Sequence, residues 1–204
     1  MRTQIMKLVR LKIAILAIVS CAVPCLADDL QTAMRNCAWC HGSLGQGYAI
    51  APRLAGQRRE YTMNQLISFG EHTRDNPHSR QYMWGAAANL SPQMARDLAI
   101  YMSLLPAEAA SDGCKELVGI GRTIYEEGIP DSNIVACSAC HGPNAEGVRD
   151  IPRLGGLSYP YLKRRLEQWG EGYHLTAKFP MPRIASKLSQ NEIEALASYL
   201  SFVK

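Results

Sequence analysis

The sequence predicts an all-α protein built from two tandem copies of one small lobe. An internal repeat, helical spacing of apolar residues and the lack of a convincing strand pattern support this fold class. The clearest helix follows Ser189, which forms a capping box with Glu192 ahead of apolar residues at i, i+3, i+4 and i+7. Further helices are expected over Gly121–Gly128 and Pro160–Trp169. Ser91-Pro92 opens a helix whose inner face should carry Met94, Leu98, Tyr101 and Met102.

The repeat aligns the two halves residue by residue, first at an offset of 100 and then, after a two-residue deletion, at 98. This pattern indicates an internal duplication. The matched pairs include His41 with His141, Pro52 with Pro152, Tyr61 with Tyr161, Met83 with Met181, and Leu90-Ser91 with Leu188-Ser189.

The most specific repeated motif is Cys37-Ala38-Trp39-Cys40-His41, which returns as Cys137-Ser138-Ala139-Cys140-His141. Two cysteines at this spacing can add to the two vinyl groups of one haem, and the next histidine can ligate its iron. A zinc ribbon would need a second ligand pair, and a thioredoxin-like dithiol would need a βαβ setting. The sequence therefore predicts two covalently bound haem c groups.

The first 27 residues match a secretory signal, with basic residues, an apolar run at Ile13–Val19 and a small-residue exit. Cleavage before Asp28 would leave domain 1 at residues 28–105, a linker at 106–113 and domain 2 at 114–204. Export predicts a periplasmic protein, soluble or peripherally attached to the inner membrane. Membrane association would come through partners or through a lipid anchor, because Ile18–Cys21 resembles a lipobox with Cys21 as the modified residue.

Charge gives no support to nucleic-acid binding. The chain has 22 Lys and Arg against 18 Asp and Glu, but four of the basic residues lie in the signal, which leaves 18 of each sign.

The sixth ligand of each iron is predicted from the repeat. Met181 is the single methionine of the second half after the motif, and it aligns with Met83. Pro180 and Pro182 suggest a stiff loop that holds its thioether toward the ring. Met63, Met94 and Met102 have no aligned partner and are expected to fill the core. Loop histidines His72, His78 and His174 are the alternative ligands, but they do not pair under the repeat and are expected in solvent.

Iron closed by His41 and Met83, or by His141 and Met181, has no vacant position for a substrate. These patterns favour an electron-transfer protein that cycles between ferric and ferrous iron over an enzyme, and no catalytic residue is assigned.

The chain resembles the dihaem cytochrome c4 family. The similarity rests on Cys-x-x-Cys-His-Gly, on Pro-Arg-Leu-Ala-Gly-Gln at 52–57, and on the segment 185–200. The resemblance implies two class I cytochrome c domains that carry electrons between respiratory partners, such as a quinol-oxidising complex and a terminal oxidase. It also implies that Pro52 and Pro152 accept a hydrogen bond from the ligand histidines. Arg53 and Arg153 would pair with haem propionates or lie in solvent.

Two alternatives stay open at this stage. Some relatives serve as the cytochrome subunit or electron acceptor of a dedicated dehydrogenase, and dihaem peroxidases and thiosulfate dehydrogenases are enzymes with two such motifs. The unpaired Cys114 is expected to be a buried or half-buried free thiol, with a disulfide-linked dimer as the alternative.

Overall fold

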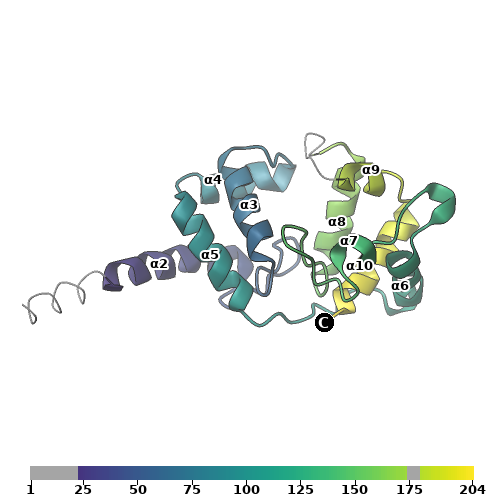
Figure 1. Cartoon of the computed structure of the whole chain (residues 1–204), viewed down its shortest axis with the longest axis horizontal. Helices are drawn as coiled ribbons and strands as arrows, with labels where there is room; N and C mark the ends of the chain where they lie inside the picture. The colour runs from purple at the N-terminus through teal and green to yellow at the C-terminus, as the bar shows by residue number, and fades with distance from the viewer. Residues whose placement is uncertain (1–22, 174–179) are drawn as a thin grey trace, which may run out of the picture. The chain divides into compact units, whose positions relative to one another are not determined.

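The computed structural model describes residues 23–173 and 180–204 (Figure 1). The chain divides into two units, residues 1–36 and 37–204, and helix α2 (Val23–His41) runs across this division. The described residues form helices and turns, with three isolated β-bridges in place of any sheet. The predicted all-α class is confirmed. Residues 1–22, which include Cys21 and most of the predicted signal at 1–27, and the loop residue His174 lie outside the described residues.

Within residues 37–204, the helices fall into two groups, here called lobe 1 (37–105) and lobe 2 (114–204) (Figure 1). The elements of lobe 1 after α2 are α3 (Arg59–Gly70), the π-helical turn η1 (Ser79–Met83), α4 (Trp84–Ala87) and α5 (Pro92–Leu104). Lobe 2 has the 3-10 turns η2 (Lys115–Leu117) and η3 (Pro130–Ser132), and helices α6 (Val118–Glu127), α7 (Ser138–His141), α8 (Tyr159–Gly170), α9 (Met181–Ala185) and α10 (Gln190–Phe202).

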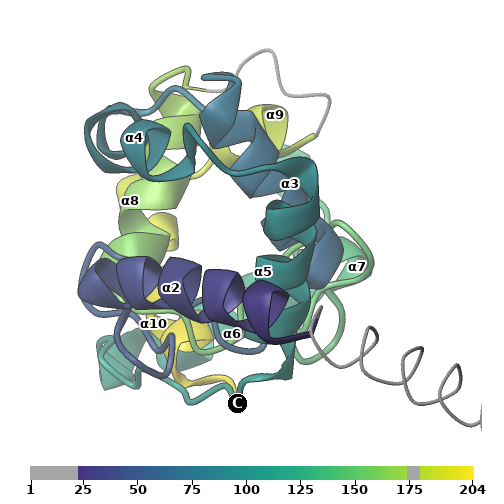
Figure 2. The ribbon, with the colours of Figure 1, turned by 90° about the vertical axis from the view of Figure 1, so that its left-hand side faces the viewer.

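The helices pack within their own lobe. In lobe 1, α3 packs on α4 and α5, and Figure 2 shows α3 and α5 side by side. In lobe 2, α10 packs on α6 and α8, and α8 packs on α9.

The predicted helix starts are confirmed in both lobes. Ser91 caps α5 by accepting a hydrogen bond from the Met94 backbone amide at 3.1 Å. Ser189 caps α10 in a complete capping box, and Glu192 accepts a bond from the Ser189 amide in return. These caps fix where the last helix of each lobe begins.

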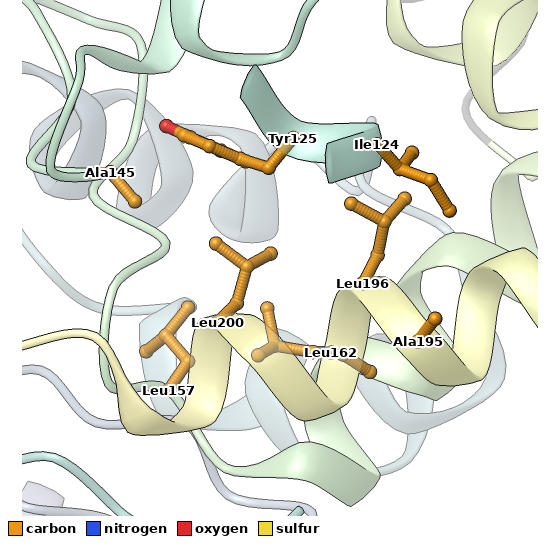
Figure 3. Packing of buried hydrophobic residues seen from close by; sticks show 9 residues of the cluster. Ile124, Tyr125, Ala145, Leu157, Leu162, Ala195, Leu196 and Leu200 are labelled. Atoms are coloured by element: carbon orange, nitrogen blue, oxygen red, sulfur yellow. The ribbon is translucent and has the colours of Figure 1, made fainter. Parts of the chain in front are cut away.

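The core of lobe 2 forms where α6, α8 and α10 meet, and Figure 3 shows its side chains pointing toward one another. Tyr125 is fully buried and donates a hydrogen bond to the Gly142 carbonyl at 2.6 Å, which ties the core to the second haem motif. The cluster comprises Ile124, Tyr125, Ala145, Leu157, Leu162, Ala195, Leu196, Ala197 and Leu200.

The inner face of α5 differs in one residue from the prediction. Leu98 and Met102 are buried and Met94 is half-buried, but Tyr101 is exposed. Ala95 and Ala99 complete the buried stripe with Leu98 and Met102, and Tyr101 lies beside this stripe.

The predicted linker is closely bonded to lobe 2. Ala110 N–H donates to the Gly156 carbonyl at 3.1 Å, and Ser111 N–H donates to the Ser201 carbonyl at 2.9 Å. The Asp112 carboxylate accepts a bond from the Tyr159 amide at 2.8 Å. The segment therefore follows a defined path. Its limits at residues 106 and 113 stay a prediction, as do the other domain boundaries.

None of the helices in the described ranges is long and apolar enough to span a membrane.

Candidate functional site

Both motif histidines are buried, and each is held through one ring nitrogen. His41 ends α2 and His141 ends α7. The Nδ1 atom of His41 lies 2.7 Å from the Pro52 carbonyl, and that of His141 lies 3.0 Å from the Pro152 carbonyl. Because a carbonyl can only accept, Nδ1 carries the proton and Nε2 is left as a bare donor of electrons to a metal. The expected contacts of both prolines are confirmed.

Burial also keeps these imidazoles in the form that binds a metal. Removal from water lowers the pKa of His41 and of His141, and the hydrogen bond to the proline carbonyl opposes this only in part. A neutral ring with a bare Nε2 is the form that ligates iron.

A tight loop after each histidine brings the proline carbonyl back to it. The Gly47 amide donates to the His41 carbonyl at 2.8 Å, and the Gly147 amide does the same to His141. Both glycines have positive φ, and a side chain on Gly47 would meet Pro52 and Arg53 backbone atoms at 2.6 Å. Glycine is therefore required at this turn in both lobes.

The four motif cysteines are free and accessible for attachment. Cys37 and Cys137 are half-buried, and Cys40 and Cys140 are exposed. The spacing places the two thiols of each pair one helical turn apart on one face, beside the motif histidine. This donor set fits a covalently bound haem c in each lobe.

The two aligned methionines lie in short helices and not in loops. Met83 ends η1 and Met181 begins α9, and both side chains are half-buried. The predicted loop around Met181 is wrong because Pro180 and Pro182 occupy the start of a helix, where proline is well tolerated.

The turn before Met83 is set by a buried polar pair. Asn76 Nδ2 donates to the Ser79 hydroxyl at 2.7 Å, and the Ser79 amide donates to Asn76 Oδ1 at 3.1 Å. Turns of the π type are frequent at functional sites, where they redirect one side chain. Sequence periodicity carries no signal for such a turn.

The two described loop histidines have different surroundings. His72 is exposed, as predicted, and its ring stacks on Trp84 with 4.0 Å between the centroids. His78 is half-buried, which contradicts the expectation of a solvent-exposed side chain. Burial and the nearby Arg164 charge lower the pKa of His78. The difference arises because His78 directly precedes the buried Ser79 at the start of η1 and so lies against the fold.

Arg53 and Cys114 differ from the sequence expectations. The Arg53 side chain is 4% exposed and donates to backbone carbonyls, so it is not a solvated arginine. Burial and then the neighbouring Arg153 charge lower the pKa of Arg53 to about 10.

Cys114 is exposed, and its thiol lies 3.0 Å from the Glu116 carboxylate. A buried thiol is wrong there because Cys114 precedes η2 on the surface.

Arg74 of lobe 1 and Arg165 of lobe 2 form a cationic cluster between the lobes. The sequence analysis did not predict this cluster. Arg74 donates to Gln65 Oε1 at 2.6 Å and approaches the Tyr161 hydroxyl at 3.4 Å. Burial and the Arg74 charge lower the pKa of Arg165 to about 10. Within residues 23–173 and 180–204, no ion pair joins either arginine to a carboxylate. The alignment of Tyr61 with Tyr161 is the sequence signal that could have located this cluster.

Comparison with known proteins is consistent with this geometry. The Cytochrome c family model matches residues 30–106 and 119–204. Cytochrome c4 of Thiocapsa roseopersicina is 34% identical over 80% of this chain and 85% of its own length. The thiosulfate dehydrogenase electron acceptor of Stutzerimonas stutzeri (strain A1501) is 36% identical over 82% of this chain and 78% of its own.

Solved structures agree in the fold. The crystal structure of reduced recombinant cytochrome c4 from Pseudomonas stutzeri matches with a TM-score of 0.76 and 29% identity, and the match covers 87% of this chain and 98% of that one. The family match, the relatives and the fold lead to one assignment. The chain belongs to the dihaem cytochrome c4 family and is an electron-transfer cytochrome of two tandem class I cytochrome c domains with two covalently bound haem c groups.

Proposed function

We propose that each haem is attached and ligated by the same set of residues in its lobe. Cys37 and Cys40 bind the first haem, with His41 and Met83 as axial ligands. Cys137 and Cys140 bind the second, with His141 and Met181 as axial ligands. The observation that carries this proposal is the histidine–proline geometry that recurs in both lobes, together with the alignment of Met83 with Met181 under the repeat.

The function that follows is electron carriage without catalysis at the iron. The bound haems supply a ferric/ferrous couple, and thioether with imidazole ligation favours the reduced state relative to more basic ligand pairs. The chain's own residues exclude a substrate by occupying both axial positions. The hydrogen bonds that hold the two imidazoles, and the short helices that carry the two methionines, also limit movement of the ligands when the iron changes between ferric and ferrous.

Replacement of each methionine tests the ligand assignment. Met181→Ala should make the second haem high-spin and lower its potential, by on the order of a tenth of the ~0.8 V that axial ligands span. The first haem should be unchanged, and Met83→Ala should give the reverse pattern. Spectropotentiometry of the two variants resolves the haems, with Met63→Ala as the control. An unaltered spectrum in Met181→Ala would remove that residue from the ligand set.

Arg74 and Arg165 are the proposed counter-ions for haem propionates. Among the described residues, the hydrogen-bond acceptors of these two guanidinium groups include the uncharged Gln65, Gln168 and Tyr161 side chains, and the cofactors bring carboxylates that could neutralise their charge. Loss of the Arg165 charge should lower the potential of a haem, because an unpaired carboxylate stabilises ferric iron. It should also raise the propionate pKa, so the potential would fall more steeply as pH rises. Potentiometry of Arg165→Gln across pH tests this; identical pH profiles in wild type and variant would contradict it.

The partners are proposed to be redox proteins on the outer side of the inner membrane. The predicted signal supports export to the periplasm. Measurement of the intact mass of the mature protein distinguishes a start at Asp28 from lipidation at Cys21.

A thiosulfate-dehydrogenase acceptor is the second candidate role, because one relative of 36% identity has that name. The two roles differ in the donor. Reduction of the purified protein by thiosulfate with a thiosulfate dehydrogenase supports the second role, and reduction only by a quinol-oxidising complex supports the first.

A further inference from the structure

Arg53 and Gln57 of lobe 1 hold lobe 2 by its backbone. Arg53 Nη1 donates to the Gly156 carbonyl at 2.9 Å and to the Glu108 carbonyl, and Nη2 donates to the Gly155 carbonyl at 2.5 Å. One planar guanidinium thus binds carbonyls of lobe 2 and of the linker at the same time.

Gln57 makes a reciprocal pair with Arg153. The Gln57 Nε2 atom donates to the Arg153 carbonyl at 2.9 Å, and the Arg153 amide donates to Gln57 Oε1 at 2.8 Å. The Gln57 side-chain amide thus satisfies both the backbone carbonyl and the backbone amide of Arg153 in the other lobe. Gln57 is itself buried.

These contacts join the segments that position the two ligand histidines. Arg53 directly follows Pro52, whose carbonyl holds His41. Arg153, which pairs with Gln57, directly follows Pro152, whose carbonyl holds His141. The proximal segments of both haem sites are therefore connected by hydrogen bonds through buried groups.

The connection is asymmetric although the sequence is duplicated. Arg153 is half-buried, and its Nε atom donates at 3.2 Å to Gly155 of its own lobe. Gln57 aligns with Leu157, which lies in the core of lobe 2. At these two positions lobe 1 supplies the side chains and lobe 2 the backbone groups. Elsewhere the direction is reversed, because Ser158 and Arg164 of lobe 2 donate to the Ala49 and Ile50 carbonyls of lobe 1 at 2.7 and 3.3 Å.

We propose that Arg53 and Gln57 are positioning residues for electron exchange between the two haems. They hold the lobes in one docked arrangement, which fixes the separation of the haems without contact to either iron. This role rests on the two-haem carrier function and not on the identity of the distal ligands.

The Arg153 amide offers a direct readout of docking, because its acceptor belongs to the other lobe. Loss of a hydrogen bond to a charged group shifts a two-state equilibrium by about 10- to 100-fold. In full-length holoprotein, Arg53→Met should therefore accelerate hydrogen exchange at the Arg153 amide by about that factor. The Gly147 amide, bonded to His141 within lobe 2, should keep its rate.

The functional readout is the rate of electron exchange between the haems after rapid reduction of one of them. The rate should fall in Arg53→Met and in Gln57→Leu, which introduces the aligned residue of the other lobe. Arg153→Met is the matched control and should keep the wild-type rate. The absorption spectrum of each haem should be the same in every variant.

Unchanged exchange at Arg153 in Arg53→Met, or equal electron-exchange rates in Arg53→Met and Arg153→Met, would overturn the proposal. If Arg53→Met fails to fold, Arg53→Lys keeps the positive charge without the planar set of guanidinium donors and should show the same faster hydrogen exchange at the Arg153 amide. A wild-type exchange rate in Arg53→Lys would equally overturn the proposal. A failure of methionine ligation would instead appear in the wild-type spectrum, so the two proposals fail separately.

Discussion

Lobes 1 and 2 hold their motif histidines alike and differ at the two aligned methionines. The Nδ1 atoms lie 2.7 and 3.0 Å from a proline carbonyl, after loops with the same glycine turn. Met83 ends a π-helical turn, whereas Met181 opens a proline-flanked helix. The hydrogen bond that orients each motif histidine is repeated, and the setting of the proposed methionine ligands, which would set the two haem potentials apart, is not.

The surfaces around the two motifs also differ. Trp39 is 84% exposed and Leu44 is 59% exposed, while the aligned residues of lobe 2 are Ala139 and Asn144. Duplication has therefore produced one apolar and one more polar motif face on similar scaffolds.

The largest stability effect should come from the aligned core leucines Leu98 and Leu196. Both are almost fully buried, so truncation to alanine should cost about 2–5 kcal/mol in each case. If the lobes are independent cores, each variant should weaken mainly its own lobe. Denaturant unfolding followed through the distal-ligand signal of each haem measures this. Ile100→Ala, on the exposed face of α5, is the control; an equal loss in both lobes would contradict separate cores.

A smaller and lobe-specific effect is expected at Gly121 of α6. A Cβ there would collide with the Ala195 carbonyl of α10, so Gly121→Ala should destabilise lobe 2 by about 1–3 kcal/mol. Gly119 lies in the same helix with open space around it, and Gly119→Ala should stabilise by about 0.5–1 kcal/mol. Thermal unfolding of both variants provides the comparison, and shifts of the same sign would refute the packing argument.

The smallest effect separates the two helix caps. Ser91→Ala and Ser189→Ala should each cost about 1 kcal/mol. Only the lobe 2 cap has a returning carboxylate, so Glu192→Ala should add a loss of a few tenths of a kcal/mol that has no counterpart in lobe 1. Urea unfolding midpoints measure these differences. A cost at Glu192 larger than at Ser189 would show that the carboxylate has another role.

The predictions that succeeded rest on short-range rules. The capping box at Ser189, the start of α5 at Ser91 and the duplicated haem motif depend on residues within one or two turns. The predictions that failed depend on tertiary contacts. Burial of Arg53 requires carbonyls a hundred residues away, and the position of His78 depends on a π-helical turn. Exposure of Cys114 and Tyr101 likewise follows from which face of an element meets the core.

The central claim is that methionine is the sixth ligand of both irons. The near-infrared charge-transfer band of methionine-ligated ferric haem, measured on the fully oxidised wild-type protein and scaled to its haem content, tests it most directly. The account predicts that both haems contribute equally to this band. A band from one haem only, accompanied by a high-spin signal from the other, would contradict the account and indicate an open site in one lobe.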